Sequence, residues 1–352
     1  MLRILVTGGA GFIGYHLIKR LFSDDSNEYT IVSIDNLNTY YDIKLKEWRL
    51  KEIEDYLLSH RADRYVFIKG DIADKEFLSG VFDRYKPDIV INLAAQAGVR
   101  ASIDHPDDYI KSNIIGFYNV LEMCRKHNVD HLVYASSSSV YGNSSDVPFK
   151  TESMTDSPVS LYAATKKSDE LLAYAYSKLY EIPMTGLRFF SVYGPAGRPD
   201  MAYFKFADKL QRGEGIDLYN YGNCRRDFTY VDDIVEGICR VILKPPIKET
   251  GKDGLPVAPH KIYNIGGGSP VELTRFVDVL VDAMKSVGIL SVDFNKEVYI
   301  HLVPMQAGDV LETYADTSPL EANFGFRPTI SLEDGIREFI KWYAEWLKIR
   351  EL

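Results

Sequence analysis

The chain has 352 residues, of which 46% are hydrophobic, and its formal net charge is −9 at pH 7. This composition supports one large or two smaller packed cores, and the negative charge argues against a nucleic-acid partner or an anionic membrane. No apolar run approaches the roughly 20 residues of a membrane span, and we expect no signal peptide. The cysteines, Cys124, Cys224 and Cys239, lack the spacing of metal ligands, so we expect no metal site. We expect their thiols to be reduced and the protein to be cytoplasmic.

The first motif joins a short strand to a helix through glycines. Residues 3–7 are apolar and partly β-branched, which predicts a buried parallel strand. The glycines that follow have the spacing of a tight turn that brings pyrophosphate to a helix N-terminus, at Gly8, Gly11 and Gly14. A second strand is expected at 30–34, and Asp35 at its end stands where a carboxylate grips the adenosine ribose. An acid at that position repels a 2′-phosphate, so the motif predicts an NAD site.

Strands and helices then alternate along the chain. We expect further strands at 65–68, 89–93, 131–135 and 184–187, and helices at 44–58, 75–85, 107–127 and 161–180. This alternation predicts an α/β fold, a doubly wound parallel sheet of Rossmann type with ligands at the carboxyl ends of its strands. Asp71 lies at such an end, where it is either an adenine contact or a turn residue.

The composition and pattern of the sequence change past Phe190, where glycine, proline and short predicted strands become more frequent. Helices are expected at 201–212, 231–243, 273–287 and 332–347, and 244–260 is expected to be a surface loop. No second glycine motif occurs, which predicts a smaller mixed α/β lobe for the substrate. We therefore divide the chain into an NAD-binding domain, 1–189, and a substrate lobe, 190–352, with a segment near 228–262 packing back onto the first domain.

A serine run at 136–139 is followed by a tyrosine and a lysine four residues apart, Tyr162 and Lys166. On a helix this spacing places the two side chains on one face. A phenol loses its proton only near pH ~10, and a nearby ammonium lowers that pKa. With Ser137 to pass or orient the proton, the group is a candidate general acid/base. The same spacing occurs in ordinary amphipathic helices, but the glycine motif favours the catalytic interpretation.

Together these motifs resemble those of extended short-chain dehydrogenases/reductases. The glycine segment 7–14, the serine run, the Tyr162–Lys166 pair and the segment 226–233 occur in that family's order over essentially the whole chain. Within the family the chain looks most like the nucleotide-sugar 4-epimerases. It resembles UDP-glucuronate 4-epimerases in particular at residues 35–42, 96–100 and 197–202.

The resemblance implies that NAD stays bound through turnover. Tyr162 then takes the 4-hydroxyl proton while hydride leaves C4, and the flat 4-keto sugar turns and takes the hydride back on its other face. Lys166 binds the nicotinamide ribose, and Asn113 matches the family's active-site asparagine, with a helix-surface position as its alternative. The expected cofactor contacts are Gly8, Gly11, Phe12, Ile13, Gly14, Asp35, Asn36, Asn38, Asp71, Ile72, Leu93, Ala94, Ala95, Gln96, Asn113, Tyr162 and Lys166.

The resemblance also implies where a UDP-sugar binds. A 4-keto uronate is a β-keto acid, which loses carbon dioxide when its carboxylate bond aligns with the carbonyl π system. Arg198 is expected to hold that carboxylate through paired hydrogen bonds, the alternative being a loop position facing solvent or a diphosphate. Arg226 is expected at the diphosphate, and Tyr219 and Asp309 at the uridine. The full expected set is Arg100, Ser137, Ser138, Ser191, Arg198, Tyr219, Arg226 and Asp309.

Two further positions bear on the reaction. Ser139 stands where dehydratases and UDP-glucuronate decarboxylases carry an acid, which favours epimerisation. Thr313 is small where some relatives carry a gating side chain that excludes N-acetyl sugars. We therefore expect an enzyme that interconverts UDP-glucuronate and UDP-galacturonate. The alternatives are a UDP-glucose or UDP-N-acetylhexosamine 4-epimerase, a UDP-glucuronate decarboxylase and a non-catalytic NAD-binding protein.

A homodimer is a further expectation from the resemblance. Family members often pair two long helices from each subunit, which correspond here to 107–127 and 161–180. Their outward faces are expected to carry Phe117, Leu171 and Tyr174, although packing of these helices against their own sheet is the alternative.

Overall fold

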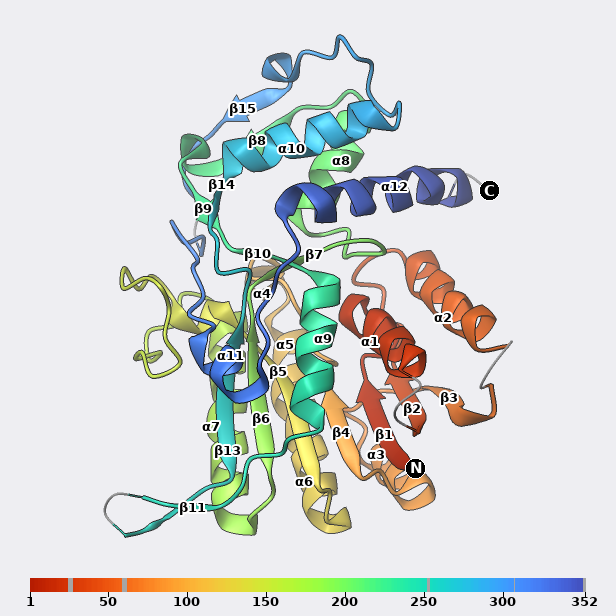
Figure 1. The fold of residues 1–352 in the computed structure, drawn as a ribbon, viewed down its shortest axis with the longest axis vertical. Coiled ribbons are helices and arrows are strands. Elements are labelled where there is room, and N and C mark those ends of the chain that lie inside the picture. Colours follow the sequence, from red (N-terminus) through yellow and green to blue (C-terminus); the bar gives the residue numbers. More distant parts are fainter. Residues whose placement is uncertain (25–27, 59–61, 252–253, 307, 351–352) are drawn as a thin grey trace.

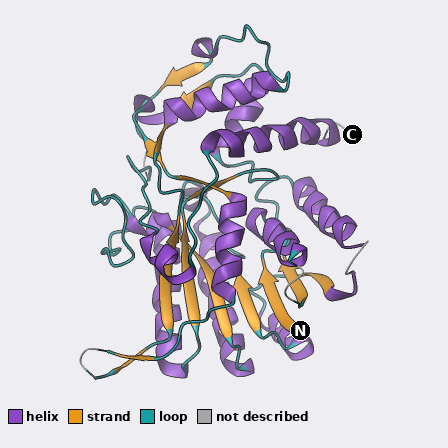
Figure 2. Cartoon of the chain, in the orientation of Figure 1, coloured by secondary structure: helices purple, strands orange, loops and turns teal. Residues whose placement is uncertain are grey.

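The computed structural model describes residues 1–24, 28–58, 62–251, 254–306 and 308–350. Two parts are visible in it (Figure 1). The larger part is a sheet with helices on both faces, and the smaller part, which contains α8, α10 and α12, lies beyond one end of the strands (Figures 1 and 2). Among the described residues, no helix is both long and apolar enough to cross a membrane.

The main sheet has seven parallel strands within the described residues, in the order β13–β6–β5–β4–β1–β2–β3. Their bounds are Leu2–Thr7 (β1), Tyr29–Asp35 (β2), Tyr65–Lys69 (β3), Ile89–Asn92 (β4), His131–Ser137 (β5), Met184–Phe189 (β6) and His260–Ile265 (β13). The first six are the expected strands, with small shifts at their ends. This confirms the predicted Rossmann-type sheet.

Both faces of this sheet are buried, as the apolar runs predict. Ile4 and Val6 of β1 pack into one core, whereas Leu5 between them packs into the core on the opposite face. Helix α1 packs between α2 and α9 over the first core, and α6 packs between α3 and α7 over the second. The bounds of these helices are Phe12–Ser23 (α1), Ile43–Leu58 (α2), Lys75–Tyr85 (α3), Phe117–His127 (α6), Leu161–Tyr180 (α7) and Val231–Ile242 (α9).

The segment after α9 differs from expectation in two ways. Residues 244–260 do not form a plain loop, because Glu249–Thr250 (β11) and Pro256–Val257 (β12) pair as a short antiparallel hairpin. Directly after it comes β13, which the sequence patterns do not predict and which extends the main sheet beside β6. Segments from the second half of the chain thus complete the larger part, because α9 packs against α1 and β13 joins the main sheet.

The helix expected at 107–127 is also more complex than predicted. It consists of α5 (Pro106–Tyr109), a π-helical turn η2 (Ile110–Gly116) and α6 in direct succession. Phe117, expected on an outward face, is buried at 1% exposure with its ring centroid 5.2 Å from that of Tyr134 on β5. The wider turn rotates the positions after it relative to a regular α-helix, which a 3.6-residue period does not anticipate.

The smaller part is built from three main helices and pairs of short strands. The helices are Ala202–Gln211 (α8), Leu273–Ser286 (α10) and Leu332–Arg350 (α12), and α10 and α12 pack on each other. The strand pairs are Ser191–Tyr193 (β7) with Phe228–Tyr230 (β10), Ile216–Leu218 (β8) with Ile300–Leu302 (β15), and Arg225–Arg226 (β9) with Val271–Glu272 (β14). The remaining elements are Ala101–Asp104 (α4), Ser318–Phe324 (α11) and the 3₁₀ turns Ala62–Arg64, Ser138–Tyr141, Tyr219–Gly222 and Lys296–Val298.

Candidate active site

A cavity of about 890 Å³ lies where the carboxyl ends of the strands meet the smaller part. Residues from both parts line it, including the glycine turn after β1, the serine run after β5, the start of α7 and the loop before α8. Apart from Asn113, every expected cofactor and substrate residue contributes to the lining. The described residues contain no cluster of ligands that could hold a metal ion.

The glycine turn forms a compact cradle at the start of α1. Gly8 has a left-handed φ of 75°, and a Cβ built on Gly14 would lie 2.2 Å from the Gly8 carbonyl oxygen. Side chains are therefore excluded where the helix packs on the turn. Helix α1 begins with no side-chain cap and no acid in its first turn. Its N-terminus therefore retains the free N–H groups and positive dipole that suit a pyrophosphate, so the turn fits NAD.

Polar side chains surround the adenosine end of the cavity. Asp35 ends β2, and its Oδ1 accepts the Leu37 N–H at 2.8 Å. The Lys46 ammonium, buried beside it, lies 3.9 Å from the Asp35 carboxylate and donates to the Asn38 side chain at 2.8 Å. Asp35 thus presents a carboxylate whose position is fixed by its own turn and by a cation.

Asp71 is held as a turn residue at the end of β3. It accepts the Ala73 N–H at 2.9 Å and lies 3.0 Å from the Lys111 ammonium. Burial alone would raise the Asp71 pKa, but these hydrogen bonds and the lysine outweigh it, so the pKa is lowered. The carboxylate is therefore ionised and available as an acceptor, and its contact with adenine stays a prediction.

The serine run and the tyrosine–lysine pair face the same cavity. Ser160 caps α7 by accepting the Ala163 N–H, which places Tyr162 in the first turn of the helix. The Ser137 oxygen accepts the Ser139 N–H at 3.1 Å, so its own proton is free to be donated. Lys166 is buried at 2% exposure, and its ammonium donates to the Ala135 carbonyl at 3.0 Å and to Asp169 at 3.2 Å.

Asn113 makes buried hydrogen bonds next to this region, outside the cavity lining. Its side chain is 1% exposed and accepts the Gln96 N–H at 2.8 Å. Its amide also donates to the Gln96 carbonyl and to the Thr165 hydroxyl, at 3.1 and 2.9 Å. It is therefore neither a helix-surface residue nor part of the cavity lining. Its contacts join the cavity segment at Gln96 to helix α7.

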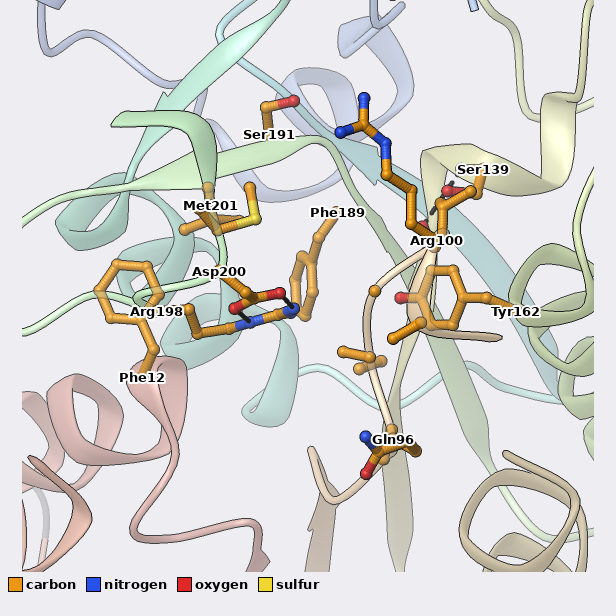
Figure 3. A pocket seen from close by; sticks show the side chains of 18 of the residues that line it. Phe12, Gln96, Arg100, Ser139, Tyr162, Phe189, Ser191, Arg198, Asp200 and Met201 are labelled. Atoms are coloured by element: carbon orange, nitrogen blue, oxygen red, sulfur yellow. Dashed lines mark hydrogen bonds and ion pairs between the residues drawn. The ribbon is translucent and has the colours of Figure 1, made fainter. Parts of the chain in front are cut away.

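Arg198 lies across the cavity from Tyr162 (Figure 3). Its Nε donates to Asp200 Oδ1 at 3.0 Å, and a second nitrogen donates to Oδ2. Tyr40 donates to the same carboxylate at 3.1 Å. Burial opposes the charge on Asp200, but Arg198 outweighs it and lowers the Asp200 pKa. Arg198 is thus a charged, oriented group in the cavity rather than a solvent-facing loop residue.

Arg100 meets the two residues expected at the uridine, Tyr219 and Asp309, in the cavity lining. Arg100 donates to Asp309 at 2.8 Å, and its guanidinium carbon lies 4.5 Å from the Tyr219 ring centroid. Arg226 lines the cavity, whereas its neighbour Arg225 pairs with Glu312 at the surface, 2.9 Å away. The contact of Arg100 with Asp309 and Tyr219 joins the two parts of the protein across the opening.

Several lining residues escaped the sequence interpretation. Asp200 and Tyr40 belong to quoted motifs, but no local spacing reveals that Tyr40, 160 residues before Asp200, binds the carboxylate that holds Arg198. Lys205 and Lys209 of α8 also line the cavity. Their four-residue spacing on a predicted helix was a usable signal, since it places both cations on one face.

A comparison with protein-family models identifies the class of this site. Residues 4–266 match the NAD dependent epimerase/dehydratase family. The chain belongs to that family. It is therefore an NAD-dependent enzyme, and the expected resemblance to nucleotide-sugar 4-epimerases is confirmed.

Individual relatives match over nearly the whole chain. Protein CapI of Staphylococcus aureus is 47% identical over 99% of this chain and 100% of its own length. A probable UDP-glucuronate 4-epimerase of Rhizobium meliloti (strain 1021) is 41% identical over 98% of this chain and 97% of its own. Among solved structures, the UDP-glucuronic acid 4-epimerase of Bacillus cereus in complex with UDP-glucuronic acid and NAD superposes with a TM-score of 0.82. It has 29% identity and covers 98% of this chain and 100% of its own.

Proposed function

We propose that the protein interconverts UDP-glucuronate and UDP-galacturonate through a 4-keto intermediate, with NAD kept bound. The observation that carries the proposal is the position of Arg198, which faces Tyr162 across the cavity (Figure 3). Full-length similarity to a probable UDP-glucuronate 4-epimerase supports the same substrate.

The glycine turn and the α1 N-terminus would hold the pyrophosphate of NAD, Asp35 the adenosine ribose and Lys166 the nicotinamide ribose. Bound NAD supplies a hydride acceptor that takes the C4 hydrogen of the sugar and later returns it. The protein's own task is to move the hydroxyl proton and to hold the ring.

Tyr162 is proposed to take the proton of the 4-hydroxyl and to return it to the new epimer. Ser137 donates to the sugar oxygen, because its own oxygen already accepts the Ser139 N–H. Lys166 places a positive charge one helical turn from the phenol, where it stabilises negative charge on the phenol oxygen. A positioned general base of this kind contributes roughly 10²–10⁴-fold to the rate.

Arg198 is proposed to keep the C5 carboxylate out of line with the C4 carbonyl, which prevents loss of carbon dioxide. A guanidinium has five N–H donors, and Asp200 takes two of them through Nε and one terminal nitrogen. A substrate carboxylate is proposed to bind donors that Asp200 does not take, while Asp200 holds the plane of the guanidinium in place. The Ser138 and Ser191 hydroxyls, which also line the cavity, are the proposed additional donors.

Two observations favour a second candidate, a UDP-glucose or UDP-N-acetylhexosamine 4-epimerase. Asp200 already balances the charge of Arg198, and Thr313 is a small side chain in the cavity wall. A neutral sugar has no carboxylate and would not need a positive charge from Arg198 beyond the one that Asp200 balances. The choice between the substrates is therefore decided by the products formed.

The test is NMR of purified enzyme with UDP-glucuronate and no added NAD. We expect UDP-galacturonate without a UDP-pentose, and Arg198→Lys should release UDP-pentose because lysine lacks the two-pronged grip. Arg225→Lys, outside the cavity, is the matched control. A UDP-pentose from the unaltered enzyme would indicate a decarboxylase, and no product would direct the test to the neutral UDP-sugars.

We also propose a homodimer through η2, α6 and α7, which lie against one another. Apolar side chains stay exposed on these elements, namely Ile110, Ile115, Tyr118, Leu171 and Tyr174. Leu171→Glu should convert the dimer to a monomer in light scattering, whereas Val292→Glu, on an exposed loop, should not. A monomeric unaltered protein would refute the proposal.

A further inference from the structure

Arg49, in the middle of α2, is a fully buried cation outside the catalytic group. Its side chain is 0% exposed. Within the described residues it has no carboxylate partner, and each of its five N–H groups donates to an oxygen. Nη1 donates to the Ala10 carbonyl at 3.0 Å and to the Tyr41 hydroxyl at 2.6 Å. Nε and Nη2 donate to the Ala196 carbonyl at 3.0 and 2.8 Å, and Nη2 also reaches the Gly197 carbonyl at 2.9 Å.

Burying a guanidinium without a counterion is unfavourable, and the protein offsets this only by satisfying every donor. The planar fork of arginine suits this arrangement because it reaches several carbonyls at fixed angles. A lysine has three donors on a flexible stem and cannot make the same five bonds. The position therefore requires arginine for its geometry rather than for its charge alone.

The groups that Arg49 joins belong to the two functional loops. Ala10 lies in the glycine turn between β1 and α1, whereas Ala196 and Gly197 immediately precede Arg198. Arg49 is thus bonded at once to the turn proposed for the pyrophosphate and to the loop that carries the proposed carboxylate clamp.

That second loop has an unusual backbone and little spare room. Ala196 has a left-handed φ of 51°, which is unfavourable for a residue with a Cβ. A Cβ on Gly197 would lie 1.7 Å from the Tyr203 hydroxyl. His16 of α1 adds a second tie, since its ring lies 2.8 Å from the Pro195 carbonyl oxygen. External hydrogen bonds therefore maintain the conformation from which Arg198 projects.

We propose that Arg49 is a positioning residue that locks the Arg198 loop to the cofactor turn and so sets the orientation of the Arg198 guanidinium. The link to product identity rests on the proposed function, in which Arg198 holds the substrate carboxylate. The mechanical link between the loops does not depend on which UDP-sugar is the substrate.

The first measurement is amide hydrogen exchange of the NAD-bound enzyme. Arg49→Lys keeps the charge but removes part of the hydrogen-bond set, and we expect exchange in 194–201 to accelerate by at least about tenfold. The matched control is Arg20→Lys, a partly exposed arginine of α1 paired with Glu236. Unchanged exchange in 194–201 would overturn the proposal whatever the substrate is.

The second measurement is the ratio of UDP-pentose to UDP-galacturonate formed from UDP-glucuronate. Arg49→Lys should raise this ratio by about tenfold or more, since a small displacement of a positioned group is costly. In an Arg198→Ala background the same substitution should change nothing, because its effect passes through Arg198. An independent, additive effect there would contradict the proposal.

The two measurements separate the two hypotheses. Faster exchange in 194–201 with no uronate turnover by the unaltered enzyme supports the Arg49 link and refutes the proposed substrate. Uronate turnover with an unchanged product ratio and unchanged exchange refutes the Arg49 link alone. If Arg49→Lys does not fold, Tyr41→Phe removes one of the five hydrogen bonds and carries the same two measurements with a smaller expected change.

Discussion

Asp169 and Lys166 form a buried pair, and the protonation of Asp169 can be tested through the pH dependence of the free energy of unfolding. Their atoms Oδ2 and Nζ are 3.2 Å apart, and the two side chains are 2% and 3% exposed. The other carboxylate oxygen of Asp169 has no hydrogen-bond partner among the described residues. Burial raises the Asp169 pKa from 3.8 to about 7, against the opposing effect of Lys166. The folded protein therefore binds a proton at Asp169 more tightly than the unfolded chain does.

The raised pKa fixes the sign of the pH dependence. Between 3.8 and about 7 the folded protein retains a proton that the unfolded chain has released. The contribution of Asp169 to the free energy of unfolding therefore falls as pH rises through this window. One full pK unit corresponds to about 1.4 kcal/mol, so the loss between pH ~5 and pH ~7 is about 2 kcal/mol.

Asp169→Asn should abolish this component while its amide oxygen still accepts from Lys166. The measurement is urea denaturation of the NAD-saturated proteins at several pH values from about 5 to 7. The free energy of unfolding of the unaltered protein, minus that of the variant, should fall by about 2 kcal/mol as pH rises from about 5 to about 7. Asp227, whose pKa burial raises to about 6, is present in both proteins and cancels. Ser177→Ala, a buried change on the same helix, is the control. If the unfolding free energies of Asp169→Asn and of the unaltered protein change with pH in parallel, the reasoning is refuted.

Three further changes test the site and its support. Tyr162→Phe should lower turnover by roughly 10²-fold or more while bound NAD, measured after denaturation, stays unchanged. Gly14→Ala should reduce bound NAD and the melting temperature, because the new Cβ would lie 2.2 Å from the Gly8 carbonyl oxygen. Glu170→Gln should lower the free energy of unfolding by about 3–5 kcal/mol, since it breaks the buried ion pair with Arg188 at 2.8 Å.

Matched variants give these predictions their controls. Gly80→Ala, whose Cβ meets no atom within 4 Å, should leave bound NAD unchanged. Glu338→Gln breaks an exposed pair with Lys341 and should cost less than about 1 kcal/mol. Undiminished turnover in Tyr162→Phe would remove the tyrosine from the catalytic role. Equal losses from the Glu170 and Glu338 changes would contradict the argument from burial.

Local patterns predicted most of the first half of the chain. The strands β1 to β6 and the helices between them have hydrophobic periods and boundary residues that do not depend on distant contacts. Local patterns do not predict strand β13, because it forms a strand by pairing with β6, 76 residues earlier in the sequence (His260 pairs with Met184). Phe117 was misplaced because the π-helical η2 breaks the period on which its outward position was predicted.

For this protein the sequence by itself determined the chemical groups: the glycine turn, the acid after β2, and the serine, tyrosine and lysine of the catalytic set. These are short motifs whose geometry is set within one or two elements. Only the tertiary structure decided how Arg198 is held, because Tyr40 reaches its partner Asp200 and Arg49 reaches the preceding carbonyls from segments about 150 residues earlier in the chain. Side-chain convergence across a cavity depends on packing between distant segments, so it emerges only once the whole chain has folded.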